Sequence, residues 1–153
     1  MSTPIQNPER LLVLYDGRCV LCNRAVRWFL RRDRRDRLRF APSESPAAAQ
    51  LLARHGFSAK DSHSAPDTIL VVLNPDGNDE TLLIRSDAVL ALLAELPRPW
   101  PSVAAVLRQI PRLFRDPAYR LVAHWRYRIW GRIESCPLNT VDKDRAAGPI
   151  QTR

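Results

Sequence analysis

The sequence predicts an α/β protein, in which helices flank a four-stranded mixed sheet and a helical extension follows at the C-terminal end. Two observations lead to this prediction. Segments with the apolar pattern of strands alternate with segments of helical apolar spacing up to about residue 96. Beyond that residue the strand patterns stop, and Pro97, Pro99 and Pro101 interrupt the chain before more helical sequence.

Each element of the sheet unit has its own local signal. Leu11–Tyr15 is almost wholly apolar, as expected of a central strand buried on both faces. Ser45 followed by Pro46 is a typical helix start, and Ser86 is a candidate cap for the last helix of the unit. In chain order we expect strand 11–15, helix 23–32, strand 37–41, helix 46–55 ending before Gly56, strand 68–73, turn 74–77, strand 81–85 and a helix after Ser86.

This order of elements also predicts the sheet topology. Right-handed crossovers make the first two strands parallel, and the turn at residues 74–77 makes the last two a hairpin. We expect the strand order 2-1-3-4. The chain would then divide into a flexible N-terminus (residues 1–9), a core (10–96), a helical extension packed on it (97–140) and a disordered tail (141–153).

The extension is predicted to hold two helices rich in aromatic residues. The first covers residues 102–110, and the second begins at Asp116 and Pro117 and ends at Trp130, before Gly131. We expect the apolar and aromatic side chains of this second helix to cover the core rather than to form a platform for a ligand. They are Tyr119, Leu121, Trp125, Tyr127 and Trp130.

Composition narrows the classes of function. The 153 residues carry a formal net charge of +8, and the excess is almost all arginine, spread over both halves of the chain. We therefore expect no nucleic-acid partner. No apolar run reaches the ~18 residues of a membrane span. The N-terminus has no apolar signal segment, so we expect the protein in the cytoplasm.

The most informative motif is a pair of cysteines, Cys19 and Cys22, which follows the first strand and a tight turn and opens a helix. A strand, a turn and a Cys-x-x-Cys at a helix start are typical of a thioredoxin-like redox site. The helix N-terminus and the neighbouring Arg18 favour the thiolate of Cys19, the candidate nucleophile. Cys22 is the candidate resolving thiol. Such exchange needs no bound cofactor or metal, although an inert pair of core cysteines is the alternative.

Four other residues are candidates for supporting roles. Asp16 either caps the turn and loop N–H groups or relays protons, and its carboxylate would raise the pKa of Cys19. Gly17 is expected to supply backbone freedom in the turn. Pro66 is the candidate for the proline that faces the cysteines in thioredoxins. Cys136 is either a second resolving thiol or a buried core residue.

Two readings without catalysis remain open. In one, the basic and aromatic extension of a thioredoxin-like binding module holds a protein or an anionic surface. In the other, the three cysteines bind zinc together with a histidine (His55, His63 or His124) and stabilise an adaptor, although a second closely spaced Cys/His pair is missing.

Several motifs together resemble the DCC family of thiol-disulfide oxidoreductases, named for its Asp, Cys and Cys. The resemblance covers about residues 10–140 and implies a thioredoxin-like fold and thiol-disulfide exchange on substrates that are largely undefined. It implies a protein or small-molecule thiol or disulfide as substrate, and an external dithiol or glutathione as reductant. The motifs that carry it are Tyr15–Asn23, Arg39–Pro42, Ile84–Ala88, Pro111–Tyr119, Arg126–Arg128 and Cys136–Leu138.

Overall fold

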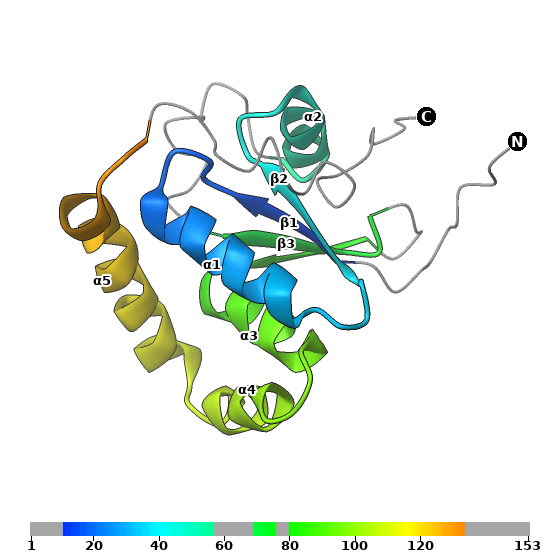
Figure 1. Cartoon of the computed structure of the whole chain (residues 1–153), viewed down its shortest axis with the longest axis vertical. Coiled ribbons are helices and arrows are strands. Elements are labelled where there is room, and N and C mark those ends of the chain that lie inside the picture. The colour runs from blue at the N-terminus through cyan, green and yellow to red at the C-terminus, as the bar shows by residue number, and fades with distance from the viewer. Residues whose placement is uncertain (1–10, 57–68, 76–79, 134–153) are drawn as a thin grey trace, which may run out of the picture.

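The computed structural model describes residues 11–56, 69–75 and 80–133, which form one four-stranded sheet with helices on both faces (Figure 1). The strand order is β2-β1-β3-β4, with β1 parallel to β2 and antiparallel to β3, and β3 antiparallel to β4. This confirms the predicted mixed sheet and its order. The strands are β1 (Leu11–Tyr15), β2 (Leu38–Pro42), β3 (Leu70–Leu73) and β4 (Thr81–Ile84).

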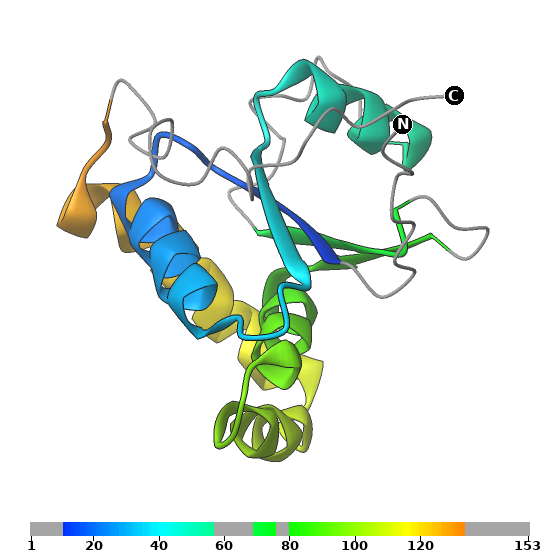
Figure 2. The ribbon, with the colours of Figure 1, turned by 45° about the vertical axis from the view of Figure 1, so that its right-hand side comes forward.

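The helices divide between the two faces of the sheet. Helix α2 covers one face, while α1 and α3 cover the other, and α4 and α5 pack outside them (Figures 1 and 2). The arrangement is thioredoxin-like, as expected. The helices are α1 (Val20–Arg32), α2 (Pro46–Arg54), α3 (Arg85–Glu95), α4 (Trp100–Arg108) and α5 (Arg112–Trp130).

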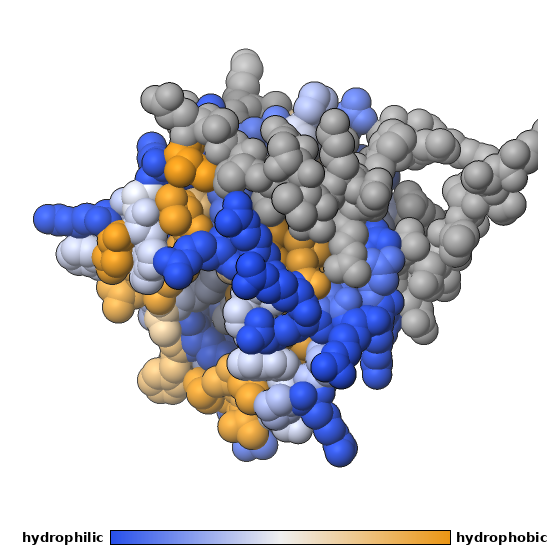
Figure 3. Space-filling model, viewed as in Figure 1, coloured by the Kyte–Doolittle hydropathy of each residue, from blue (hydrophilic) through white to orange (hydrophobic). Residues whose placement is uncertain are grey.

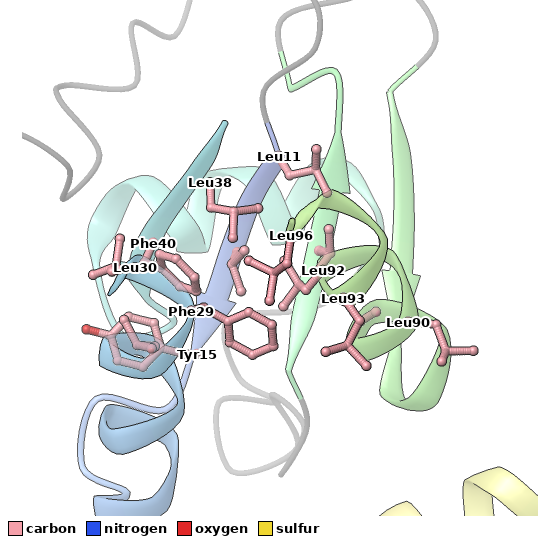
Figure 4. Close-up of a cluster of buried hydrophobic side chains, with 14 of the residues drawn as sticks. Leu11, Tyr15, Phe29, Leu30, Leu38, Phe40, Leu90, Leu92, Leu93 and Leu96 are labelled. Atoms are coloured by element: carbon pink, nitrogen blue, oxygen red, sulfur yellow. The ribbon is translucent and has the colours of Figure 1, made fainter. Parts of the chain in front are cut away.

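Strand β1 is the centre of the core, and all five of its residues are buried. Because side chains alternate along a strand, Leu11, Val13 and Tyr15 join the larger cluster under α1 and α3, shown in Figure 4. Leu12 and Leu14 join a second cluster under α2. The prediction of a strand buried on both faces is confirmed.

Local capping explains where the first two helices begin and end. The Cys19 sulfur accepts a hydrogen bond from the Cys22 N–H, so α1 begins three residues before the predicted start. The Ser45 hydroxyl caps α2 as predicted, accepting from the Ala48 N–H at 3.2 Å. Gly56 ends that segment with a φ of +80°, a backbone conformation that favours glycine.

Two predicted helix starts were wrong. Ser86 does not cap α3; it lies inside the helix, and its hydroxyl donates to the Asp116 carboxylate of α5. Helix α5 begins at Arg112, so Pro117 lies within it. A proline there removes one backbone hydrogen bond, but Arg115 and Asp116 on its N-terminal side are held by side chains of α3, which keep this turn in place.

The expectation that the aromatic extension covers the core holds for only part of it. Trp100 of α4 packs edge-on against Trp28 of α1, with ring centroids 4.7 Å apart. On α5, by contrast, Leu121, Trp125 and Trp130 are exposed to solvent. That part of the prediction was wrong, because polar rather than apolar side chains of α5 face the core. Among the helices described, none is long and apolar enough to cross a membrane.

We predict that Leu14→Ala lowers the free energy of unfolding by about 2–5 kcal/mol, because it leaves a cavity between the sheet and α2. Urea unfolding monitored by circular dichroism measures the change. Leu121→Ala is the matched control: Leu14 is 0% exposed and Leu121 is 60% exposed. A control loss as large as that of Leu14→Ala would contradict this account of the core.

Candidate active site

The cysteine pair lies where the chain leaves β1 and enters α1. Cys19 is the N-cap of α1, and its sulfur accepts from the Cys22 N–H at 3.4 Å. Cys19 is 0% exposed, whereas Cys22 is half-buried. Both are free thiols in this structure. One turn of helix therefore places the second thiol beside the first.

The two thiols have opposite ionisation tendencies. A hydrogen bond from the Cys22 side chain is the main cause that lowers the pKa of Cys19 to about 6; the Cys22 N–H and the charge of Arg126 also lower it. Burial and the Asp16 carboxylate act against this shift, and the effect of Asp16 confirms the expectation from the sequence. The same hydrogen bond, together with burial, raises the pKa of Cys22. At neutral pH the pair therefore holds one thiolate, on Cys19, and one thiol.

The turn before Cys19 is fixed by two polar side chains. Asp16 Oδ1 accepts from the Arg18 N–H at 2.9 Å. Asn23, buried on α1, donates from Nδ2 to the carbonyls of Gly17 (2.8 Å) and Cys19 (2.9 Å). Gly17 is buried in this turn, and the backbone freedom expected of it stays a prediction. The turn is held by side chains that bind its backbone.

A buried arginine from α5 completes the site. Arg126 is 3% exposed, and its guanidinium donates to Asp16 Oδ2 at 3.1 Å and to Cys22 Sγ at 3.6 Å. It also donates to the Tyr127 hydroxyl at 2.9 Å. The cation beside the dithiol is therefore Arg126; Arg18, which the sequence suggested, is not among the groups that shift the pKa of Cys19. The positive charge of Arg126 therefore lies beside the cysteine pair, where the thiolate forms.

A short segment after α5 lies against the same turn; we call residues 131–133 the strap. The Ile133 N–H donates to the Arg18 carbonyl at 2.9 Å, and the Val20 N–H donates to the Gly131 carbonyl at 3.5 Å. Arg132 forms an isolated β-bridge with Cys19. In Figure 1 the strap is the orange coil that leaves the end of α5 near the start of α1. The strap thus pairs with the backbone of the candidate nucleophile.

The structure brings together five of the seven site residues predicted from the sequence: Asp16, Gly17, Arg18, Cys19 and Cys22. Pro66 and Cys136 lie outside the described residues. Sequence reasoning gave no role to Asn23 or Arg126, although both stand within the motifs that carry the family resemblance. Their occurrence in those motifs was the available signal, because neither residue type suggests a redox site by itself.

The predicted zinc alternative involves residues that the structure does not place. Cys136 and His63 are outside the described ranges. His55 pairs with Glu80, and His124 is exposed on α5. Over residues 11–56, 69–75 and 80–133, no three His, Cys, Asp or Glu side chains are grouped so that they could hold a metal ion.

The chain is similar to known proteins over most of its length. Residues 13–132 match the DCC1-like thiol-disulfide oxidoreductase family. A chloroplastic DCC family protein of Arabidopsis thaliana is 36% identical over 137 residues, which are 90% of this chain and 74% of the relative. The uncharacterized protein YuxK of Bacillus subtilis is 30% identical over 136 residues, 89% of this chain and 91% of the relative. No solved structure matches significantly.

We predict that Arg126→Gln raises the apparent pKa of Cys19 above its value of about 6, because it removes a positive charge that lowers this pKa. A rise of about one pH unit would lower the thiolate fraction at pH 6 about fivefold. The pH dependence of alkylation by iodoacetamide, read at Cys19 by mass spectrometry, measures it. Arg128→Gln, the same charge change on the exposed face of α5, is the control. An unshifted midpoint in Arg126→Gln would contradict the assigned role.

The strap also yields a prediction. Gly131 has a φ of +80° and open space around the position of an added Cβ, so Gly131→Ala strains the backbone without a clash. We expect the strap to loosen and Cys19 alkylation to become faster at a fixed pH. Gly56→Ala carries the same φ of +80° and the same open space, away from the dithiol, and should leave the rate unchanged. Equal rates in both variants would rule out shielding by the strap.

Proposed function

Because the chain belongs to the DCC1-like thiol-disulfide oxidoreductase family, we propose that it exchanges disulfides through Cys19 and Cys22, with Cys19 as nucleophile. The family assignment supports a thiol-disulfide role and thiol or disulfide substrates. The observation that carries the finer proposal is the asymmetry of the pair, since the pKa of Cys19 is lowered to about 6 while that of Cys22 is raised. A nucleophile must be a thiolate at working pH, and a resolving thiol must keep its proton until the second step.

The proposed reaction has two steps. The Cys19 thiolate attacks one sulfur of a substrate disulfide, forms a mixed disulfide and releases the other substrate sulfur as a thiolate. Cys22 then loses its proton, attacks Cys19 Sγ and releases the second substrate thiolate. The substrate gains two electrons, and the protein retains a Cys19–Cys22 disulfide. An external dithiol or glutathione returns the pair to the reduced state, and the steps can also run in reverse.

Within this proposal the supporting residues have separate tasks. Arg126 favours the Cys19 thiolate, which the Asp16 carboxylate disfavours, while Asp16 and Asn23 hold the turn. Because Cys19 is 0% exposed, a substrate reaches it only after local opening, and we propose that the strap is the part that moves. Gly17 and Arg18 supply the backbone that the strap and Asn23 bind. We leave supporting roles for Pro66 and Cys136 as predictions.

The proposal extends to organisation and location. We propose that residues 10–96 carry the dithiol chemistry, and that residues 97–140 are an extension that supplies Arg126 to it. We also propose a cytoplasmic location, where cellular thiols such as glutathione would keep the cysteine pair mainly in its reduced form. The relative named as chloroplastic makes another compartment the alternative. A non-catalytic binding module remains the competing function. The tests of Cys19 and Cys22 described below distinguish it from an oxidoreductase.

We predict a reversible Cys19–Cys22 couple with a potential between about −270 and −120 mV. Equilibration in glutathione buffers, followed by alkylation and mass spectrometry of each cysteine, measures it. The Cys136→Ser variant should give the same potential, because the proposed pair does not include Cys136. If the pair never forms a disulfide, the oxidoreductase proposal fails and the binding module replaces it.

The order of attack has its own test. Cys22→Ser should accumulate a mixed disulfide between Cys19 and glutathione, because no resolving thiol is present to release it. Cys19→Ser should form the adduct at Cys22 more slowly, because burial still raises the pKa of Cys22 once the Cys19 hydrogen bond, the main cause of its rise, is removed. Intact-mass measurement after exposure to oxidised glutathione distinguishes the two variants. Faster adduct formation at Cys22 than at Cys19 would reverse the assignment.

A further inference from the structure

The amphipathic pattern of α5 is inverted relative to an ordinary surface helix. Its contacts with the rest of the protein are polar: Arg115 binds Asp87 at 3.2 Å, Tyr119 accepts from the Ile69 N–H at 2.8 Å, and Arg126 binds Asp16. Its one buried residue is that arginine. A helix of a globular protein usually turns its apolar stripe inward, so the outward stripe of α5 needs a partner other than the core.

The outward stripe is long and strongly exposed. Its members recur at helical spacing, and their exposed fractions range from 40% to 66%. They are Phe114, Leu121, Val122, Trp125 and Ile129. In Figure 3, hydrophobic residues gather at the left and lower left of the molecule, where Figure 1 places α5 and α4. Apolar surface gathered in this way marks an interaction site.

The same region is strongly basic. Residues 100–132 contain seven arginines and no lysine, against a single acid, Asp116, which binds Ser86. Six of the eight positive net charges of the chain therefore lie in this segment. Arg120 and Arg128 are exposed beside the stripe, and Arg128 stacks over Trp125 at 5.3 Å. The basic excess lies in both halves of the chain, and in the second half it is concentrated in this segment.

Charge and shape together identify the partner. A second copy would bring two basic faces together, and nucleic acid would leave the apolar stripe against water. A helix of 19 residues is about 28 Å long and about 10 Å wide, so its footprint of roughly 300 Å² is small against the ~800 Å² per partner of a stable protein interface. A basic helix with Trp, Phe and Leu on its apolar side is typical of binding in the plane of a membrane.

We propose that the exposed face of α5 docks on the surface of an anionic lipid bilayer. Phe114, Leu121, Val122, Trp125 and Ile129 enter the boundary between headgroups and acyl chains. Arg120 and Arg128 lie at the level of the lipid phosphates, since arginine keeps its guanidinium in the polar layer while its stem covers apolar surface. The helix lies in the bilayer plane and does not cross it.

The test is co-sedimentation with vesicles of phosphatidylcholine that contain roughly a third phosphatidylglycerol, compared with phosphatidylcholine alone. We expect partition onto the anionic vesicles that falls as salt rises. Two double variants should each lower the partition coefficient by about tenfold or more: Leu121→Ser with Ile129→Ser, and Arg120→Glu with Arg128→Glu. Unchanged thermal unfolding of each variant shows that it is folded.

The matched control is Arg34→Glu with Arg35→Glu, which changes the net charge equally at exposed positions after α1. It should keep most of the binding. Equal loss in this control would overturn the proposal, because binding would then follow net charge alone. Absence of partition onto either vesicle would overturn it in favour of a protein partner. A dimer that forms without lipid and that dissociates in the Leu121→Ser with Ile129→Ser variant would overturn it in favour of a second copy.

This inference is independent of the proposed exchange reaction. The Cys19→Ser variant should bind anionic vesicles as the unmodified protein does, because Cys19 is buried and takes no part in the face. A protein that exchanges disulfides but does not bind vesicles, and one that binds vesicles without exchange, would each refute one proposal and leave the other standing.

Discussion

The interaction on which the rest of the structure depends is the buried contact of Arg126 with Asp16 and Cys22. An arginine that is 3% exposed is costly unless its charge is matched, and here a carboxylate, a thiol sulfur and the Tyr127 hydroxyl all accept from it. Asp16 comes from the turn after β1 and Cys22 from α1, which lie 110 and 104 positions before Arg126 in the chain. This contact therefore joins the end of α5 to the dithiol and places a positive charge beside it.

The polar attachment of α5 explains both of its faces. Arg115, Tyr119 and Arg126 bind the core through hydrogen bonds and ion pairs, and no side chain of α5 belongs to either buried hydrophobic cluster. Its hydrophobic residues are consequently placed outward, beside exposed arginines. In the two proposals the inner face supports the exchange chemistry and the outer face docks, so a change of packing on one side need not disturb the other.

The sequence predicted those features of the fold and the site that depend on neighbouring residues. The apolar run of β1, the Ser45 cap of α2 and the cysteine pair at the start of α1 are each set by neighbours within a few residues, and all were found where expected. It did not predict contacts between distant segments. Arg126 and Asp16 are 110 positions apart. Ser86 does not cap its own helix, and its hydroxyl donates to Asp116, which is 30 positions away. Propensity carries no information about such partners.

The charges at the site also bear on whether the two faces of α5 are coupled. In the reduced state Arg126 stands near two anions, the Asp16 carboxylate and the Cys19 thiolate, so these three groups sum to one negative charge. A disulfide removes the thiolate and leaves Arg126 paired with Asp16 alone, which sums to zero. The ion pair that anchors α5 is thus better matched after oxidation than before it. We therefore expect α5 to keep its position in both redox states, so that the face it presents does not change with the state of the dithiol.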